Sequence, residues 1–401
     1  MFGFKGRSTD TSEEKIDELL TRGVSEVIEK DSLKRELLSG KQLRIKLGID
    51  PTSPNIHLGR SITLLKLRDF QMLGHKIIFI VGDATGIIGD TSDKESERPM
   101  LTREEVEANA KTYLEQAGKI LDMALVEKKY NSGWLDALTY KEIGDQANIF
   151  SVSDFTAREN IKKRLDEGKR VSLREMLYPL MQGYDSVMVR ADVEIGGTDQ
   201  RFNMLAGRKL QPLYKQKPQN ILTTELVEGL DGRKMSSSWG NTINLTASPA
   251  DMYGKVMRLK DELIVKYLTL ATRVSLKKIS EVEKKLKDGV NPKEVKMLLA
   301  REIVTFYYNE KEAEKAEKEF QKIFSEGGVP EEISRVKVKK DSLLSDILIE
   351  NKILDSKSEF RRLVDQGGVE LGGEKITSHK EGVRAGVLKL GKHRFFEIEV
   401  S

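Results

Sequence analysis

The stretch LRIKLGIDPTSPNIHLGRSITLLKLRDFQMLGHKIIFIVGD, residues 43–83, decides the fold of the largest part of the chain. A strand-like segment at 43–50 is followed by apolar residues at helical spacing over 57–73. Gly74 separates this helix from an apolar strand at 76–83. Strand, helix and strand in this order build a parallel sheet, which binds ligands at the carboxyl ends of its strands. The sequence therefore predicts an α/β fold with a nucleotide-sized site near residues 50–60 and 82–90.

The composition indicates a soluble protein of two or three domains. The 401 residues exceed the usual size of one domain, and no apolar run approaches the roughly 20 residues that span a bilayer. The chain has no cysteine and only four histidines. We therefore expect no disulfide, no metal held by the protein, no membrane partner and a reducing, cytoplasmic location. The net charge of +4 does not by itself indicate nucleic-acid binding.

Changes in periodicity divide the rest of the chain. Apolar residues at helical spacing predict a helical packing arm at 11–38, and charged helical patterns predict an insertion between sheet halves at about 101–175. Two more strands are expected within 187–197 and 220–229, after which the sheet ends. Helix formers with opposite charges four residues apart predict a separate α domain at 248–326. A segment rich in glycine then predicts a linker before a compact tail of helices and short strands.

The loop between the first strand and its helix carries groups suited to a nucleotide. Asp50 and Thr52 follow the strand, and His57 and Gly59 stand where the helix begins. A helix N-terminus attracts phosphate through its unpaired N–H groups, and a glycine leaves room for a base or ribose against the backbone. A histidine at this place is about as often a cap or a packing residue, so this loop does not decide the function alone.

A second segment, RKMSSSWGN at 233–241, places two cations and three hydroxyl groups on a loop. Such a loop could bind polyphosphate through charge and hydrogen bonds, although the same pattern also fits a solvated linker. Together, HLGR at 57–60 and KMSSS at 234–238 resemble the HIGH and KMSKS signatures of class I aminoacyl-tRNA synthetases. The pair is far more specific than either segment.

Segments between these signatures indicate the member of the class. LYPLMQGYDS at 177–186 and EIGGTDQRFN at 194–203 resemble the amino-acid-binding segments of tyrosyl-tRNA synthetases, and VGDATGIIGDTSDKESERPML agrees. The resemblance covers the chain from about residue 40 onward. It implies a Rossmann-like catalytic domain at 39–247, an α-helical anticodon-binding domain at 248–326 and a linker at 327–340, and the helical arm expected from periodicity then occupies 1–38. The tail at 341–401 resembles the S-four-type, α+β RNA-binding domain that closes bacterial members.

The resemblance implies roles for individual residues. Asp90, Tyr178 and Gln182 would bind the substrate ammonium, Asp185 would receive the phenol hydroxyl, and Gln200 would lie near the amino and carboxylate groups. Because Tyr178, Gln182 and Asp185 are spaced four and three residues apart, a helix would turn all three the same way. The remaining implied site residues are Asp50, Gly59, Gly197, Asp199, Lys234 and Met235 for ATP; Thr52, His57, Arg60, Lys234 and Ser236 for catalysis; Lys94 and Arg98 on a mobile loop; and Lys357, Arg361, Arg362, Lys392 and Arg394 for RNA.

Three positions depart from the family pattern. Arg60 stands where the family usually has the second histidine of its signature, and we expect its guanidinium to replace the imidazole near ribose or phosphate. A surface cation that leaves the work to His57 is the simpler alternative. Ser237 replaces a lysine, and Lys46 replaces a tyrosine that shares recognition of the phenol in some members, so Lys46 is expected in the tyrosine site.

The implied reaction joins tyrosine to tRNA(Tyr) in two steps. The tyrosine carboxylate attacks the α-phosphorus of ATP, and a terminal tRNA ribose hydroxyl then takes the tyrosyl group, with Mg²⁺ shielding the β- and γ-phosphates. The family implies a homodimer, with the helical residues near 150–165 as a candidate interface. A tryptophanyl enzyme, an RNA-binding or splicing protein derived from a synthetase that has lost catalysis, and a generic nucleotidylyltransferase are the alternatives.

Overall fold

The βαβ unit expected at residues 43–83 is present in the computed structural model, which describes residues 9–90, 100–325, 334–338, 342–351, 353–354, 356–391 and 394–400. β2 (Arg44–Ile49) leads through α3 (Leu58–Met72) to β3 (Lys76–Val81), and the two strands pair in parallel. β3 is buried over five of its six residues, as expected for a strand covered on both faces. The described residues group into two compact units, Met1–Ala313 and Glu314–Ser401.

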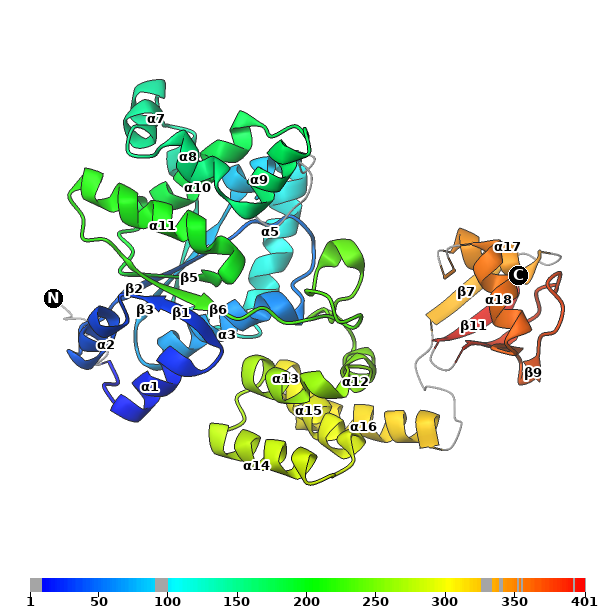
Figure 1. Cartoon of the computed structure of the whole chain (residues 1–401). Coiled ribbons are helices and arrows are strands. Elements are labelled where there is room, and N and C mark those ends of the chain that lie inside the picture. Colours follow the sequence, from blue (N-terminus) through cyan, green and yellow to red (C-terminus); the bar gives the residue numbers. More distant parts are fainter. Residues whose placement is uncertain are drawn as a thin grey trace. The chain divides into compact units, whose positions relative to one another are not determined.

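A six-stranded sheet forms the centre of the first unit (Figure 1). Its order is β1-β6-β5-β2-β3-β4, and every neighbouring pair is parallel except β1 with β6. The other strands are β1 (Val24–Ile28), β4 (Val126–Tyr130), β5 (Val193–Gly197) and β6 (Asn220–Thr224). The predicted parallel α/β fold is confirmed.

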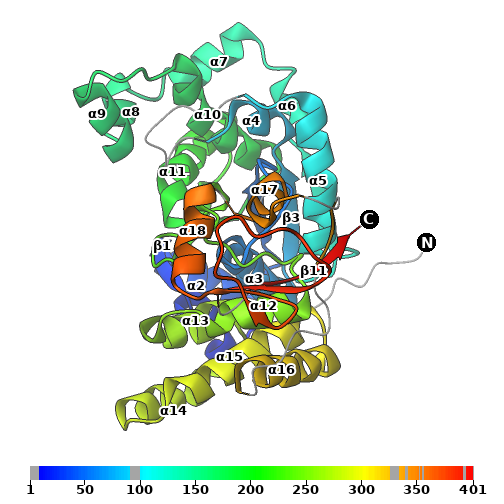
Figure 2. The same ribbon diagram turned by 90° about the vertical axis from the view of Figure 1, so that its right-hand side faces the viewer.

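The strand order changes direction between β2 and β5. The chain passes from β2 to β3 on one side and from β5 to β6 on the other. Right-handed connections then place α3 and α11 (Arg201–Leu210) on opposite faces of the sheet, as Figures 1 and 2 show. The crevice at such a switch point is where open α/β sheets bind ligands.

Helices complete the first unit around the sheet. They are α1 (Glu13–Thr21), α2 (Lys30–Leu38), α4 (Asp83–Ile88), α5 (Arg103–Ala117), α6 (Ser132–Leu135), α7 (Tyr140–Ala147), α8 (Val152–Thr156), α9 (Glu159–Asp166), α10 (Leu173–Met188), α12 (Pro249–Met257), α13 (Ile264–Ala271), α14 (Leu276–Lys287) and α15 (Pro292–Tyr307), with α16 (Glu310–Ser325) following. Short 3-10 turns are η1 (Thr198–Gln200), η2 (Gln211–Tyr214), η3 (Ser237–Trp239) and η4 (Asp261–Leu263). None of the helices in the described ranges has the length and apolar character needed to cross a bilayer.

Two strands were not expected from periodicity. The prediction of helix throughout 11–38 is wrong at β1, and the insertion at about 101–175 contains β4 among its helices. Both are five-residue strands at the two edges of the sheet, and neither is an apolar run. In β4 only Val126 is buried, and the exposed Lys128 and Tyr130 alternate with the half-buried Glu127 and Lys129, as is common where one side of an edge strand faces water.

The helices expected at 248–326 are present, and α12–α15 belong to the same compact unit as the sheet. The Arg22 guanidinium donates to the carbonyl groups of Leu268 and Thr272 at the carboxyl end of α13. The hydroxyl of Tyr307 in α15 lies 2.9 Å from that of Ser61 in the first turn of α3. Division of this unit into catalytic and anticodon-binding domains near residue 247 stays a prediction.

The described part of the carboxyl-terminal unit consists of the end of α16, a second, five-stranded sheet and two further helices. The strand order of this sheet is β7-β11-β10-β8-β9. The elements are β7 (Ser334–Val338), α17 (Leu344–Glu350), α18 (Lys357–Asp365), β8 (Val369–Leu371), β9 (Glu374–Lys375), β10 (Gly386–Leu390) and β11 (Arg394–Val400). The predicted small α+β tail is confirmed. Residues 334–338 of the expected linker instead form β7, paired in parallel with β11, and the rest of 327–340 lies outside the described residues.

Candidate active site

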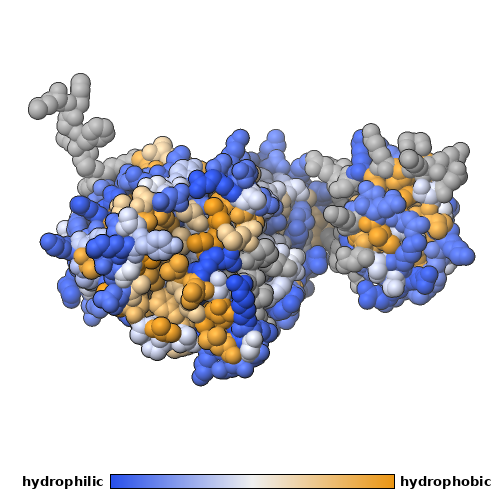
Figure 3. Space-filling model, turned by 90° about the horizontal axis from the view of Figure 1, so that it is seen from above, coloured by the Kyte–Doolittle hydropathy of each residue, from blue (hydrophilic) through white to orange (hydrophobic). Residues whose placement is uncertain are grey.

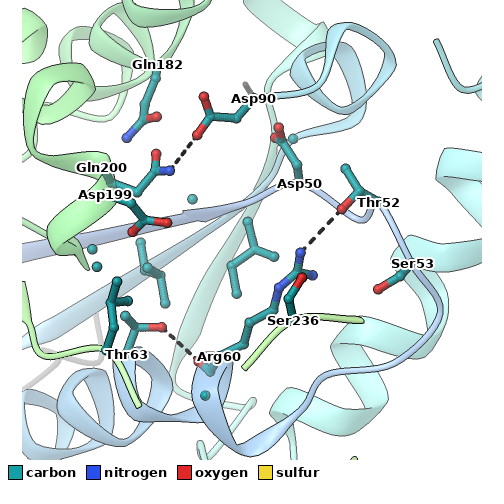
Figure 4. Close-up of a pocket in the computed structure, with 18 of the residues that line it drawn as sticks. Asp50, Thr52, Ser53, Arg60, Thr63, Asp90, Gln182, Asp199, Gln200 and Ser236 are labelled. Carbon is teal, nitrogen blue, oxygen red and sulfur yellow. Dashed lines mark hydrogen bonds between the residues drawn. The ribbon is translucent and has the colours of Figure 1, made fainter. Parts of the chain in front are cut away.

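A cavity of about 460 Å³ opens at the carboxyl ends of β2 and β5, within the size range of small-molecule sites (Figure 4). Most of the residues assigned to tyrosine, ATP and catalysis from the sequence line this one cavity. They are Asp50, Thr52, His57, Gly59, Arg60, Asp90, Tyr178, Gln182, Asp185, Gly197, Asp199, Gln200, Lys234, Met235 and Ser236. Lys94 and Arg98 lie outside the described residues.

α10 presents Tyr178, Gln182 and Asp185 to the cavity, as their spacing predicts. The Tyr178 hydroxyl donates to Oδ2 of Asp50 at 2.7 Å. Burial, followed by the charges of Asp50 and Asp90, raises the pKa of Tyr178 well above its usual value. Tyr178 is therefore a neutral hydrogen-bonding group at the wall of the cavity.

Asp185 is buried at the end of this row of side chains and is held by two donors. Trp134 Nε1 donates to Oδ1 at 2.8 Å, and Asn131 Nδ2 donates to Oδ2 at 3.2 Å. Burial raises the pKa of Asp185 to about 7, although these donors and Lys46 oppose the shift. Asn131 also donates to the Thr85 hydroxyl, so the carboxylate belongs to a fixed polar network.

Sequence reasoning missed Asn131 and Trp134. Both follow β4, and a polar residue directly after a parallel strand is a candidate for the ligand edge of the sheet. Because β4 itself was predicted as part of a helical insertion, this signal could not be used. Trp134 is one of only two tryptophans in the chain.

Lys46 does not line the cavity, contrary to its expected place in the tyrosine site. Its ammonium is fully buried and donates to Glu194 at 2.8 Å, to the Ser186 hydroxyl at 2.8 Å and to the Gln182 carbonyl at 2.9 Å. A buried charge requires such compensation. Lys46 thus connects β2 to the part of α10 that contains Gln182 and Ser186.

Two pairs on the β5 side each connect side chains assigned to one substrate, tyrosine in the first pair and ATP in the second. Gln200 Nε2 donates to Asp90, as Figure 4 shows, and Lys234 Nζ lies 2.9 Å from Oδ2 of Asp199. A Cβ added at Gly197 would lie 2.5 Å from Oδ1 of Asp199. Glycine at this position therefore lets the Asp199 carboxylate fold back over the strand end.

His57 caps the start of α3. Its Nδ1 accepts from the backbone N–H of Arg60 at 3.3 Å. Burial, followed by the charges of Arg60 and Lys234, lowers the pKa of His57 to about 3. The ring is therefore neutral near pH 7, and with Nδ1 accepting, its proton is on Nε2.

The KMSSS segment is attached to the start of α3. The Gly59 N–H points to Met235 Sδ at 3.2 Å, and the Leu58 N–H donates to the Ile243 carbonyl at 2.8 Å. A Cβ at Gly59 would lie 3.1 Å from His57 Nδ1 and 3.3 Å from Met235 Cβ. The glycine thus permits close approach of the two signatures.

Asn241, which the sequence did not single out, organises this segment from its far end. Its Oδ1 accepts from the Ser236 N–H at 2.8 Å, and its Nδ2 donates to Asp231 at 2.7 Å and to the Lys234 carbonyl at 3.1 Å. The asparagine is buried, so these bonds are protected from water. An amide is suited to this place because it donates and accepts at once.

Arg60 extends from α3 toward the loop after β2 (Figure 4). Nη2 donates to Thr52 Oγ1 at 3.3 Å, and Nη1 donates to the hydroxyl of Tyr113 in α5. The guanidinium thus lines the cavity instead of pointing into bulk solvent, which disfavours its interpretation as a plain surface cation.

The residues expected to bind RNA lie in the second unit. Arg361 and Arg362 are exposed on α18, and Lys357 forms an ion pair with Asp346 at 2.6 Å. Arg394 is bonded to Glu359 and to the Ile353 carbonyl. Lys392 lies outside the described residues.

Comparison with known proteins decides the family. The family described as tRNA synthetases class I (W and Y) matches residues 38–325. Tyrosine–tRNA ligase of Thermotoga maritima is 44% identical, covering 97% of this chain and 98% of the relative. That of Carboxydothermus hydrogenoformans is also 44% identical, covering 95% and 97%. The chain belongs to the tyrosyl-tRNA synthetases.

Solved tyrosyl-tRNA synthetases share the fold. A C-terminally truncated mitochondrial enzyme from Aspergillus nidulans has a TM-score of 0.65 at 22% identity, covering 78% of this chain and 94% of that one. The enzyme of Archaeoglobus fulgidus complexed with L-tyrosine has a TM-score of 0.61 at 24% identity, covering 77% and 100%.

Proposed function

We infer that the chain is a tyrosine–tRNA ligase, which activates L-tyrosine with ATP and transfers the tyrosyl group to the 3′ end of tRNA(Tyr). One observation carries this conclusion. A single cavity joins a buried carboxylate fit for a phenol, Asp185, to the HLGR and KMSSS segments. An indole N–H could also donate to this carboxylate, and the preference for tyrosine over tryptophan is supported by the relatives named above, which are tyrosine–tRNA ligases.

At the amino-acid end, the phenol hydroxyl would donate to Asp185, and the ammonium would lie among Tyr178, Gln182 and Asp90. A site that must pair an OH group leaves a polar group unsatisfied when phenylalanine enters. Tyrosyl-tRNA synthetases are themselves the established example of this kind of discrimination between tyrosine and phenylalanine. Gln200 would bridge the ammonium site to the substrate carboxylate.

At the nucleotide end, Gly59 would give the base and ribose clearance, and Asp199 would accept from a ribose hydroxyl. Thr52, His57 Nε2, Arg60, Lys234 and Ser236 would donate to the phosphates. Lys234 would exchange its ion pair with Asp199 for a phosphate. Mg²⁺ would enter as the counter-ion of ATP, on its β- and γ-phosphates.

In the first step, a carboxylate oxygen of tyrosine forms a bond to the α-phosphorus while the bond to the β-phosphate bridging oxygen breaks. Pyrophosphate leaves, and the donors around it stabilise its charge. In the second step, a ribose hydroxyl of the tRNA attacks the tyrosyl carbonyl carbon, and AMP leaves. The chain acts by positioning and charge stabilisation, with no covalent intermediate on a side chain.

Pyrophosphate exchange into ATP tests the function. We expect exchange that depends on tyrosine, with phenylalanine and tryptophan giving far lower kcat/KM. Exchange that prefers tryptophan would establish the tryptophanyl alternative. If exchange were absent and tRNA binding retained, the chain would be the alternative named above, an RNA-binding protein derived from a synthetase that has lost catalysis.

For tRNA binding we propose the exposed face of α18 with Arg361 and Arg362, supported by its pattern of cations over a buried core. Truncation at about residue 340 should weaken tRNA(Tyr) binding and reduce its salt dependence. Tyrosine-dependent exchange should persist, because its cavity lies in the other unit. Unchanged tRNA affinity would contradict this role.

We also propose a homodimer in the cytoplasm. Large apolar side chains are exposed on α7–α10, with Tyr140 at 95% and Leu173 at 83% exposure, and Figure 3 shows apolar residues gathered on this side of the first unit. Exposed apolar groups of this kind commonly mark an interface. Leu173→Glu should convert a dimer to a monomer in sedimentation experiments, and a wild-type monomer would refute the proposal.

A further inference from the structure

Arg60 is held by neutral oxygens. Its two terminal nitrogens donate to the Tyr113 hydroxyl and to Thr52, and its guanidinium carbon lies 5.8 Å from the centre of the Tyr113 ring. Within the residues that the structure describes, no carboxylate forms an ion pair with Arg60. Lys234 differs, because Asp199 lies 2.9 Å from its ammonium. An anion can therefore bind the Arg60 guanidinium without first breaking an ion pair with a carboxylate of the described residues.

Tyr113 is fixed so that its oxygen accepts from Arg60. It is 1% exposed, and its hydroxyl lies 3.3 Å from that of Ser53. The Ser53 hydroxyl donates to the Asn55 carbonyl, so Tyr113 gives its own proton to Ser53 and keeps a lone pair for the guanidinium. Each donor in this series of hydrogen bonds, from Arg60 through Tyr113 and Ser53 to the Asn55 carbonyl, therefore has an acceptor.

The rest of α5 fixes the same loop to Tyr113. The Thr112 hydroxyl donates to the Pro54 carbonyl at 2.8 Å, and Gln116 Oε1 accepts from the Ile56 N–H at 2.7 Å. Helix α5, the loop after β2 and the start of α3 therefore form one block around Arg60. Such pre-organisation reduces the side-chain entropy that an arginine loses when it binds a phosphate.

The start of α3 has a single permanent charge at the cavity. His57 is neutral because it is buried, and Thr52, the neighbour of Arg60, is uncharged. We propose that Tyr113 is a positioning residue that holds the Arg60 guanidinium on the β- and γ-phosphates of ATP and on the departing pyrophosphate. This inference deepens the proposed function and rests on it for the identity of the phosphate ligand.

A double-mutant cycle in pyrophosphate exchange tests the inference. Tyr113→Phe keeps the buried ring and removes the acceptor. It should raise the KM for ATP and for pyrophosphate by about tenfold, because the loss of one hydrogen bond to a charged group weakens binding by about that factor. The KM for tyrosine should not change. Arg60→Ala should lose more, and adding Tyr113→Phe to it should change nothing further.

The matched control is Tyr214→Phe, which removes a hydroxyl bonded to Gln146 at 2.9 Å and away from the cavity lining. It should behave as wild type. Equal losses from Tyr113→Phe with and without Arg60, or a parallel rise in the KM for tyrosine, would overturn the inference in favour of a general packing role.

Calorimetric titration with inorganic pyrophosphate separates this inference from the proposed function. Pyrophosphate should bind the wild-type chain more tightly than either single variant. Pyrophosphate binding that depends on Arg60, in a chain without exchange activity, would refute the function and keep the inference. If the chain showed exchange activity but neither variant changed pyrophosphate binding, the inference would be refuted and the function kept.

Discussion

The two ends of the cavity hold their polar groups in different ways. At the phenol end, Asp185 is buried and fixed by Asn131 and Trp134 before any substrate arrives. At the phosphate end, Lys234 is paired with Asp199 on a half-exposed segment that Asn241 ties down. Discrimination between two similar side chains needs a fixed acceptor, whereas capture of a polyphosphate needs cations whose present partners can be replaced.

The largest expected effect is at the fixed end. Asp185→Asn should lower kcat/KM for tyrosine by about 100-fold or more, because the amide has one oxygen where the carboxylate has two, while Trp134, Asn131 and the phenol all require an acceptor. The preference over phenylalanine should fall with it. Exchange kinetics measure both, and Asp199→Asn is the matched control, since it removes the same charge but should spare the KM for tyrosine. A normal KM for tyrosine in Asp185→Asn would break the comparison.

At the exchangeable end, Lys234→Ala should lower kcat by about 30-fold, since one cation on the developing pyrophosphate charge is removed. The KM for tyrosine should not change. Arg233→Ala removes the neighbouring cation, which is exposed and contacts Asp231 and Trp239, and should have little effect. If both variants lost activity equally, net charge rather than the placement of Lys234 would be responsible.

A smaller effect should separate the acceptor from its support. Trp134→Phe removes the 2.8 Å bond to Asp185 while keeping an aromatic ring, and should raise the KM for tyrosine by about tenfold. Trp239→Phe, at the exposed tryptophan, is the control for ring replacement. Steady-state exchange at varied tyrosine gives the answer, and a rise in the KM for ATP alone would show that Trp134 does not act through Asp185.

The smallest expected effect concerns the pH dependence of the free energy of unfolding. The folded chain keeps His57 neutral down to about pH 3, whereas the unfolded chain binds a proton near pH 6.5. The unfolded state therefore binds more protons below that pH, and the free energy of unfolding falls as pH decreases. His57 should account for about 1 kcal/mol of this fall between about pH 7.5 and pH 6. His57→Gln should show a shallower pH dependence in denaturant titrations, with His75 unchanged as an internal reference. Equal slopes would contradict a neutral, buried His57.

The pH dependence of Asp185 has the opposite sign. Its folded pKa of about 7 lies above the usual value, so its ionisation opposes folding as pH rises through the interval between the two values. Burial is the largest cause at both positions, since it disfavours the charged form of an acid and of a base alike. His57 and Asp185 thus differ in their charge and partners more than in their burial.

Much of the fold follows from sequence because its central strands are buried and its helices amphipathic. β2, β3, β5 and β6 fall where apolar runs predict them. The edge strands β1 and β4 do not, because a short strand with one wet side is formed by pairing with its neighbour and has little signal of its own. Local pattern also could not show that α12–α15 pack with the sheet in one unit.

The cavity residues were predictable where the spacing is local, as for Tyr178, Gln182 and Asp185, or where the family pattern covers them. Lys46 was misplaced because its position matches a residue of the phenol site, while its length and charge lead it to the buried carboxylate of Glu194. The partners that fix the site, Asn131, Trp134, Tyr113 and Asn241, come from distant segments. Only the folded structure brings them to their targets.

β4 also limits how this enzyme can be recombined with its relatives. The segment 101–175 includes the strand that closes one edge of the sheet and is followed at once by Asn131 and Trp134. It also includes α5, with its bonds to the loop before α3. A chimaera that exchanged this segment as a helical module would import another enzyme's support for both substrates. A chimaera would therefore retain activity only if the boundaries of the exchanged segment followed the contacts of the sheet rather than the helical pattern of the sequence.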